Sequence, residues 1–292
     1  MRNTHIKGRI GLHTFMAAPA AMLFLVFFII PLAQGVGMSF TDWDGMGTPR
    51  FIGFTNFFDF FRDSRATGDI RTTILFALGS APLLNIAGLC YALLMNGSFR
   101  GKGIARFIIY LPAVISPLIM GYIWYFLLQP GRGYLYHAME LMGNGALVSG
   151  WMNSYAHTMT VLILVNAWQY AGMTMVIYLA GLQAISPELY ESAHIDGAGS
   201  WVSFWEITLP LLRPSIQINV VTNIIGSLSV FDIVMSLTEG GPGYSTETLS
   251  IYIMRMCYGS RTGYSTAVAV IMFFIILVPV VISMRLTGAK EG

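Results

Sequence analysis

Residues 186–210 read SPELYESAHIDGAGSWVSFWEITLP and form a polar stretch between the fourth and fifth apolar runs of the chain. Ser186 suits a helix N-cap, and Pro187 suits the first helical position, where its missing N–H costs nothing. Gly197 suits a helix stop, because glycine accepts the left-handed conformation that a helix C-terminus needs. The segment therefore predicts a short helix, a turn, and a second short helix that is capped by Ser200.

The composition of the chain indicates a protein that lies in a lipid bilayer. Apolar residues make up 55% of the 292 residues, charged residues make up only 10%, and the mean hydropathy is +0.65. These values lie outside the usual composition of soluble domains. The 16 basic and 14 acidic residues nearly cancel, so charge gives no argument for a nucleic-acid partner. We expect an all-α integral membrane protein.

Six apolar segments are long enough to cross a bilayer, whose core of about 30 Å needs roughly 20 residues in a helix. They cover residues 15–38, 72–95, 107–128, 158–182, 216–238 and 264–284. The first run has no small-residue cleavage pattern, so it is interpreted as a retained helix and not as a signal peptide. We expect six transmembrane helices in one domain over 1–292, with its core at about 72–286.

The positions of Lys and Arg in the short loops predict the orientation of the chain. Basic residues gather before the first span, after the second and after the sixth: Arg2, Lys7, Arg9, Arg100, Lys102, Arg106, Arg285 and Lys290. These ends are expected to face the cytoplasm, which places both termini inside. The segment 186–210 must then be cytoplasmic as well, although it has four acidic residues and no Lys or Arg.

This cytoplasmic loop also contains a fixed spacing that helix capping alone does not explain. Glu-Ser-Ala at 191–193 is followed after three residues by Gly, and nine residues later by Ile-x-Leu-Pro. The pattern resembles the signature of the membrane subunits of ATP-binding-cassette (ABC) importers, which begins Glu-Ala-Ala and differs here only at Ser192. The residues that the resemblance assigns to ATPase coupling are Glu191, Ser192, Ala193, Asp196, Gly197, Ile207, Leu209 and Pro210. It implies that residues 186–210 form a coupling-helix elbow, which docks into a separate ATPase subunit.

Three other segments resemble the carbohydrate importers within this family. They are Asp42-Trp43, the run FIGFTNF at 51–57 and the run LTEGGPGYSTETLSIYI at 237–253. The resemblance is to permeases of the maltose and glycerol-phosphate type, and to the first of the two paired membrane subunits of that type. It covers essentially the whole chain and implies the fold of a type I ABC importer permease.

The family resemblance also implies a set of partners. The chain would form one half of a heterodimer with a second permease subunit, in the cytoplasmic membrane of a bacterial cell. Two ATP-binding subunits would dock from inside, and an extracytoplasmic sugar-binding protein would deliver carbohydrate to the loops at 42–71 and 240–252. The chain has no Gly-x-x-x-x-Gly-Lys-Ser/Thr phosphate loop, so ATP and Mg²⁺ are expected on the partner subunits, with no cofactor on this chain.

Polar side chains in the fourth and fifth spans are candidates for a substrate site, because polar groups are costly in lipid. Positions 166 and 170, and positions 219, 223 and 227, recur every four residues, so each set lies on one helical face. In the maltose-type family a sugar occupies a mid-membrane cavity, and the resemblance assigns these residues to it: Asn166, Gln169, Tyr170, Met173, Asn223, Gly226 and Ser227. The alternative is that such side chains bond only between helices.

Asp232 is the only ionisable residue well inside a predicted span, so it must face protein or water. It is a candidate for a gate, for the interface with the second permease subunit, or for a substrate contact, and the sequence does not choose among them.

Other functions are less compatible with the sequence. An intramembrane enzyme would need a nucleophile with its base, and His157 has Ser154 nearby but no orienting carboxylate. No catalytic residue and no metal site is therefore predicted. An ion-coupled secondary transporter could use Asp232, although the internal repeat that such folds often have is not found. A permease of an ABC importer for a substrate other than a sugar also remains open.

Overall fold

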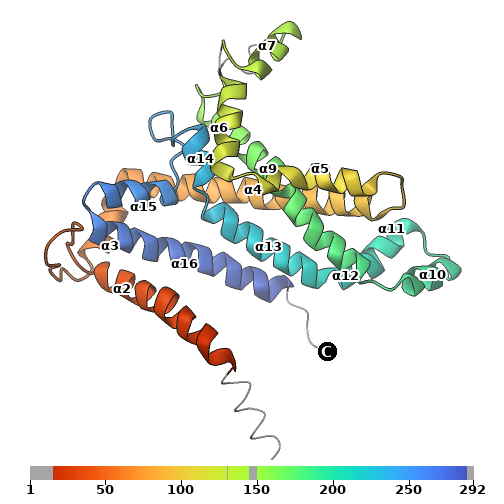
Figure 1. The fold of residues 1–292 in the computed structure, drawn as a ribbon, viewed down its shortest axis with the longest axis horizontal. Helices are drawn as coiled ribbons and strands as arrows, with labels where there is room; N and C mark the ends of the chain where they lie inside the picture. The colour runs from red at the N-terminus through yellow and green to blue at the C-terminus, as the bar shows by residue number, and fades with distance from the viewer. Residues whose placement is uncertain (1–15, 130, 145–149, 288–292) are drawn as a thin grey trace, which may run out of the picture. The chain divides into compact units, whose positions relative to one another are not determined.

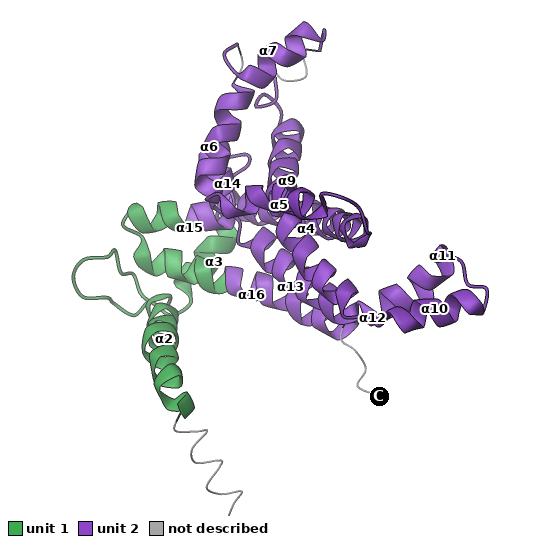
Figure 2. Ribbon diagram, turned by 45° about the vertical axis from the view of Figure 1, so that its right-hand side comes forward, with its two compact units in different colours: residues 1–62, 253–271 green, residues 63–252, 272–292 purple. Residues whose placement is uncertain are grey.

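The computed structural model describes residues 16–129, 131–144 and 150–287. These residues form helices and their connecting loops, with an isolated antiparallel bridge between Thr41 and Phe51. The chain divides into two compact units, residues 1–62 with 253–271 and residues 63–252 with 272–292 (Figure 2). The expectation of an all-α protein is confirmed for the described residues.

The smaller unit contains the first apolar helix and the loop that follows it. Its elements are η1 (Leu25–Ile29), α2 (Ile30–Met38), α3 (Thr55–Arg62) and the parts of α15 (Leu249–Tyr258) and α16 (Thr262–Thr287) within 253–271. The side chains of η1 and α2 are not buried in the chain, as expected for an apolar helix surrounded by lipid. The amide of Asn56 donates to the carbonyls of Ser39 at 2.9 Å and Thr41 at 2.8 Å, which fixes the loop after α2.

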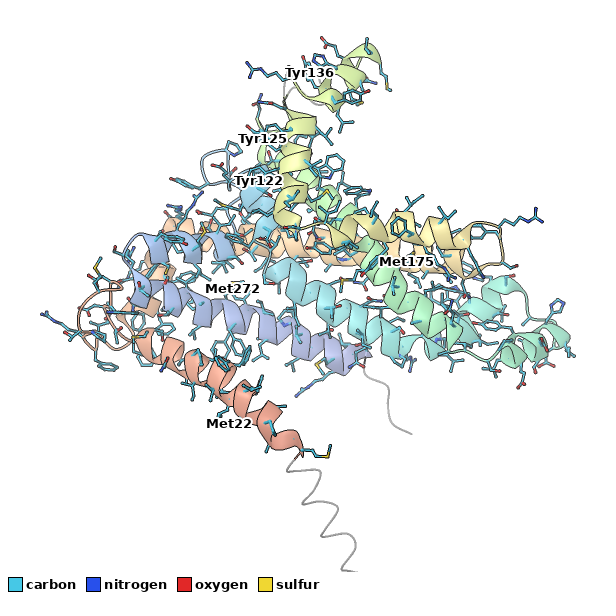
Figure 3. All side chains as sticks on the ribbon, viewed as in Figure 1. Met22, Tyr122, Tyr125, Tyr136, Met175 and Met272 are labelled. Carbon is cyan, nitrogen blue, oxygen red and sulfur yellow. The ribbon has the colours of Figure 1, made fainter. Side chains whose placement is uncertain are left out.

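The larger unit is built around one central helix, α9. Its elements are α4 (Ser64–Asn96), α5 (Lys102–Val114), α6 (Pro117–Leu128), α7 (Tyr134–Leu141), α9 (Tyr155–Gln183), α10 (Pro187–Ile195), α11 (Ser200–Ser203), η2 (Phe204–Thr208), α12 (Leu209–Leu211), α13 (Arg213–Leu228), α14 (Asp232–Leu237) and the rest of α15 and α16 (Figure 1). Helix α9 packs against α4, α5 and α13. Met175, labelled in Figure 3, lies on α9 and is fully buried in this core.

Helices α9 and α4 run parallel to each other. The side-chain amide of Asn166 donates to the hydroxyl of Ser80 at 2.6 Å. Eight residues further along both helices, a side chain at Gly88 would collide with Thr174. Because the residue numbers rise together along the contact, both helices cross the unit in the same direction, and the glycine allows them to approach closely.

Helix α13 runs antiparallel to α9. Thr174 and Asn223 exchange hydrogen bonds of 3.3 and 3.4 Å, whereas Gly181, later in α9, lies against Ser215, earlier in α13. Consecutive helices of alternating direction are what the predicted order of spans requires.

Helix α5 is also antiparallel to α9, and the two cross at a glycine. A side chain at Gly172 would collide with the backbone of Ile109 and Tyr110, so a larger residue would force the helices apart. One turn earlier in α9, the amide of Gln169 donates to the carbonyl of Ile115 at 3.1 Å.

The expectation of a continuous third span over 107–128 is wrong. Helices α5 and α6 meet at an angle of 96°. Ile115 and Ser116 between them have extended backbone, with ψ of 138° and 131°. The steric demand of Pro117 on the residue before it explains this break.

The expectation of a continuous fifth span over 216–238 is also wrong, because α13 ends at Leu228 and α14 begins only at Asp232. The hydroxyl of Thr248 donates to the carbonyl of Val230 at 3.0 Å, so a backbone group within the break has a partner. Broken helices are tolerated at membrane depth where protein satisfies the backbone in this way.

The expected count of six spans is not confirmed. Among the residues that the structure describes, four helices are long and apolar enough to cross a bilayer, and the bent α5 and α6 pair would make a fifth. The four are Met16–Met38, Ser64–Asn96, Tyr155–Gln183 and Thr262–Thr287.

Candidate functional site

The elbow (residues 186–210) folds as two short helices around a glycine turn, which confirms that part of the prediction. Helix α10 spans Pro187–Ile195, and Gly197 follows it with a φ of +85°. The amide of Ala198 donates to the carbonyl of Ala193 at 2.8 Å, and that of Gly197 donates to His194 at 3.1 Å. This pair of bonds is the Schellman arrangement, and it satisfies the carbonyls at the end of α10.

Of the two predicted serine caps, Ser186 is confirmed as the N-cap residue and Ser200 is wrong. Ser186 takes the N-cap position of α10, but its side chain makes no capping hydrogen bond within the described residues. The N-cap of α11 is Gly199, whose backbone is extended with a ψ of 168°, and Ser200 is the first residue of the helix. A glycine can adopt the N-cap conformation without a side-chain cap, so the helix begins one residue earlier than expected.

The elbow exposes large apolar side chains. Ile195 is 85% exposed and Trp201 is 74% exposed. Trp201 contacts the ring of Trp205 with centroids 5.7 Å apart, and Phe204 contacts Trp205 at 5.4 Å. Exposed clusters of this kind are typical of surfaces that another protein or a membrane covers.

A hydrogen bond links the two arms of the elbow. The hydroxyls of Tyr190 in α10 and Thr208 in η2 lie 3.0 Å apart, and Thr208 is buried. Four of the eight residues assigned to ATPase coupling lie at or near the turn and are exposed: Glu191, Ser192, Asp196 and Gly197. The others are half-buried: Ala193, Ile207, Leu209 and Pro210. The acidic and turn residues are thus on the outer surface, while the Ile-x-Leu-Pro tail packs at the base.

A cavity of about 270 Å³, in which amide and hydroxyl groups interrupt a mainly apolar wall, lies between α4, α9 and α13. Six of the seven residues assigned to the substrate line it: Asn166, Tyr170, Met173, Asn223, Gly226 and Ser227. The other lining residues are Leu84, Thr174, Ile177, Asn219 and Thr222. The structure therefore brings together side chains that the four-residue spacing had placed on two separate faces.

Gln169 does not line this cavity, so its expected position there is wrong. Its side chain is fully buried and donates to the carbonyl of Ile115, next to the break between α5 and α6. Gln169 thus faces α5, and its amide bonds to a backbone group that the break leaves without a helical partner.

Two polar atoms of the cavity residues have no hydrogen-bond partner within the described part of the chain, Asn219 Oδ1 and Ser227 Oγ. Buried polar groups are rarely left unpaired, because each costs about 1–3 kcal/mol. The amide of Asn219 does donate to the carbonyl of Thr174, at 3.3 Å. The cavity can therefore accept further hydrogen bonds from a polar molecule.

Thr174, Asn219 and Thr222 were not among the assigned residues, although they line the cavity. For two of them the sequence did contain a signal. Asn219 lies four residues before Asn223, and Thr174 lies four residues after Tyr170, so both continue the polar faces.

Asp232 is the first residue of α14, after the break, and it is exposed in the chain. The expectation that it lies inside a continuous span is wrong for this reason. Its carboxylate at the N-terminus of a short helix is favourable for the helix dipole.

The loop that contains Gly-Gly-Pro-Gly is bound to the start of α4. Glu247 is fully buried, and its carboxylate accepts two hydrogen bonds from Arg65, Nε to Oε2 at 2.6 Å and Nη2 to Oε1 at 2.9 Å. The hydroxyl of Tyr252 donates to Asp63 at 2.7 Å, and Asp63 also caps α4. The sequence did not predict these two contacts, because the residues that they join are 182 and 189 positions apart in the chain.

Proteins with similar sequences are membrane components of transport systems. The chain is 32% identical over 275 residues to a probable starch degradation products transport system permease protein of Thermoanaerobacterium thermosulfurigenes, which covers 94% of this chain and 93% of that protein. It is 31% identical over 289 residues to a multiple sugar-binding transport system permease protein of Streptococcus mutans, with 95% of each covered. It is also 31% identical over 277 residues to a lactose transport system permease protein of Rhizobium radiobacter, covering 94% and 92%.

The fold is also found in a solved structure. A chain of a bacterial alginate ABC transporter, crystallised in complex with an alginate pentasaccharide-bound periplasmic protein, superposes with a TM-score of 0.83 and 26% identity over 99% of both chains. Residues 85–290, which include the elbow and all of α9 and α13, match the family described as binding-protein-dependent transport system inner membrane component. The chain therefore belongs to this family, as a multi-pass permease subunit of a binding-protein-dependent transporter.

Proposed function

We propose that the chain forms one half of the membrane channel of an ATP-driven carbohydrate importer. The observation that carries this proposal is the cavity between α4, α9 and α13, with the unpartnered Asn219 Oδ1 and Ser227 Oγ of its described residues. A carbohydrate presents many hydroxyls, which both donate and accept hydrogen bonds, and amide and hydroxyl side chains are suitable partners for them. The relatives named for starch products, multiple sugars and lactose support a sugar as the substrate.

The substrate passes between this chain and a second permease subunit. A cavity of about 270 Å³ is slightly smaller than most sites for small molecules, so a partner must supply part of the wall for an oligosaccharide. Asp232, exposed next to the break at the end of α13, is placed to contact that partner or to act at a gate. No arginine or lysine lines this cavity in the described residues, which favours a neutral sugar over a phosphorylated one.

The elbow couples the channel to ATP hydrolysis. Its exposed Ile195 and Trp201 would be covered by a groove of an ATP-binding subunit, and Glu191 and Gly197 lie at the same surface. One such subunit would bind this elbow and a second the elbow of the partner permease, and both would hold ATP and Mg²⁺. Movement of the docked elbow would pass through the bond between Tyr190 and Thr208 to α12 and then to α13, which forms part of the cavity wall.

Both termini and the elbow face the cytoplasm in this proposal. Lys and Arg gather between the C-terminal end of α4 and the start of α5, whereas residues 229–248, which include the Gly-Gly-Pro-Gly loop, contain no Lys or Arg. The parallel course of α4 and α9 and the opposite course of α5 and α13 support this alternation of spans. The loop 240–252 then faces outward, where an extracytoplasmic binding protein would deliver the sugar.

Replacement of Ser227 by alanine is expected to raise the KM for sugar uptake about fivefold without loss of folded protein. The Ser227 hydroxyl has no partner in the described chain, so its removal costs no internal hydrogen bond, whereas a lost bond to substrate weakens binding by about 0.5–1.5 kcal/mol. Uptake of radiolabelled maltotriose, lactose and N,N′-diacetylchitobiose into proteoliposomes would measure the effect. Ser229→Ala is the matched control, because that hydroxyl is exposed and bonds to the carbonyl of Ile225. Equal KM values in both variants would contradict a sugar contact at Ser227.

Uptake by the reconstituted complex is expected to require ATP inside the vesicles and both ATP-binding subunits. A secondary transporter would instead use an ion gradient and continue without nucleotide. The measurement compares sugar uptake with ATP, with ADP, and with a proton or sodium gradient alone. Transport that persists without the ATP-binding subunits would contradict the ATP-driven mechanism while leaving the sugar specificity intact.

A further inference from the structure

A second cavity, of about 450 Å³, lies at the start of α4 and α9. The loop between α14 and α15 closes one side of it. Its lining residues are Ser64, Arg65, Gly68, Asp69, Arg71, Thr72, Tyr155, Gly243, Tyr244 and Ser245. The volume falls within the range of sites that bind small molecules.

Three buried polar atoms of this lining have no hydrogen-bond partner among the described residues: Asp69 Oδ2, Tyr155 Oη and Ser245 Oγ. Asp69 is only 2% exposed, so its free carboxylate oxygen is separated from bulk water. Single unpaired atoms occur in native proteins, but three on the wall of one cavity indicate a polar molecule that satisfies them together.

The charges around the cavity favour a neutral molecule. Arg65 and Arg71 are opposed by Asp69 and by Glu247, which forms the bidentate pair with Arg65. The guanidinium of Arg65 is thus already bound by Glu247, and Arg71 is exposed to water, so no buried arginine of the described lining is left to bind an anion. The remaining lining groups are hydroxyls and backbone, which can both donate to and accept from a polyhydroxylated ligand.

An aromatic ring forms part of the wall. Tyr244 is 52% exposed, and the guanidinium of Arg65 lies 3.8 Å from the centre of its ring. The backbone of Tyr244 is in the left-handed conformation, with a φ of +68°, which is unfavourable for a residue other than glycine. Strained residues of this kind cluster at functional sites, where surrounding contacts hold them in place. A tyrosine ring offers an apolar face and a polar tip to a ligand.

The two cavities lie along the same pair of helices. Thr72 of the second cavity and Leu84 of the first are 12 residues apart on α4, and Tyr155 and Asn166 are 11 residues apart on α9. At 1.5 Å per residue these steps separate the two sites by roughly 17 Å along parallel helices. In the proposed orientation, the second cavity is on the outer side of the first.

We propose that this outer cavity is a carbohydrate subsite, which binds one neutral sugar residue on its way from the binding protein to the mid-membrane cavity. Asp69 Oδ2 accepts from sugar hydroxyls, and Tyr155 and Ser245 bond to others, while Tyr244 packs at the ring. The inference rests on the proposed function, since it adds a second site to the same transport path.

The double variant Tyr155→Phe with Ser245→Ala tests this subsite. Both hydroxyls lack partners among the described residues, so their removal should leave the fold intact. The complete complex, in proteoliposomes with its partner permease, ATP-binding subunits and binding protein, is assayed with maltotriose, lactose and N,N′-diacetylchitobiose. We expect the KM for an imported probe to rise about tenfold and kcat to change less than twofold, because two hydrogen bonds to the sugar are lost. Ser283→Ala is the control, since it removes a buried, unpartnered hydroxyl of the described chain from α16, away from this cavity.

The outcomes separate the two proposals. If the wild-type complex imports a probe and the double variant matches Ser283→Ala, the subsite is refuted and the sugar permease stands. If the wild type imports none of the three probes, the sugar permease fails and the subsite fails with it. The affinity of the binding protein for the complex is measured in parallel on nanodiscs. A tenfold loss of that affinity with an unchanged KM would show that the cavity receives a protein segment, which also overturns the proposal.

Discussion

Sugar uptake is expected to fall at least about 100-fold when Gly197 is replaced by aspartate, although the chain should still reach the membrane. Gly197 has a φ of +85°, where a side chain causes backbone strain, although aspartate tolerates this region better than most residues. The new carboxylate would also lie on the exposed face of the elbow, where docking of an ATP-binding subunit would remove it from water. An unpaired charge in an interface typically costs 2 kcal/mol or more, and the two costs together account for the loss. The assay combines uptake with sugar-stimulated ATPase activity, which should fall in parallel.

Gly199→Asp is the matched control for this prediction. Gly199 is also exposed in the elbow, and neither glycine has another atom within 4 Å of an added Cβ. The φ of Gly199 is −75°, so a side chain there causes no backbone strain. We expect Gly199→Asp to lose much less activity. If Gly197→Asp transported sugar at the wild-type rate, with the protein confirmed in the membrane, the elbow would have no coupling role.

The elbow could be predicted from sequence because its structure depends on local chemistry. Pro187 begins a helix by its own geometry, and Gly197 ends it by its own conformational freedom. Neither effect needs a distant partner. The Ser200 cap was wrong for a reason that is also local, since the extended Gly199 could begin α11 without the help of Ser200.

The broken spans could not be predicted, because an apolar run looks the same whether its helix is continuous or broken. Each break has a distant side chain beside it: Gln169 bonds to the carbonyl of Ile115, and Thr248 bonds to that of Val230. These partners are 54 and 18 residues away in sequence. Gln169 was wrongly assigned to the substrate cavity because of the first break. Its side chain faces α5, and the position of α5 relative to α9 cannot be derived from the apolar pattern.

The cavity between α4, α9 and α13 could be predicted only in part. The spacing of Asn219, Asn223 and Ser227 was sufficient to place them on one face of α13. That this face meets Asn166 and Tyr170 of α9 depends on the antiparallel contact of the two helices, which periodicity does not contain. Extending the polar face of α9 by one further turn would have included Thr174, whereas Asn219 already lay on the polar face of α13 and was only left unassigned.

The contacts that hold the Gly-Gly-Pro-Gly loop include a buried ion pair between Glu247 and Arg65. Glu247 is fully buried, whereas the side chain of Arg65 is 31% exposed, so the two partners are not equivalent. Removal of Arg65 would take away the positive partner of a buried glutamate that also lies close to Asp69. Breaking a buried pair in this way typically costs 3–5 kcal/mol, whereas replacing both partners by apolar residues is often nearly neutral.

Arg65→Ala is therefore expected to release the loop, with an opening free energy lower by about 3 kcal/mol. Hydrogen exchange of the amides at 240–249, followed by mass spectrometry, should accelerate roughly 100-fold, because each 1.4 kcal/mol changes the open population tenfold. The double variant Arg65→Leu with Glu247→Leu should restore most of the protection, since the buried Glu247 is removed together with its partner. Arg71→Ala serves as a control on the same helix, because Arg71 is exposed and changes no buried pair. Unchanged exchange in Arg65→Ala would mean that other contacts hold the loop, among them the bonds of Tyr252, Thr72 and Thr73 to Asp63, Ser245 and Leu249.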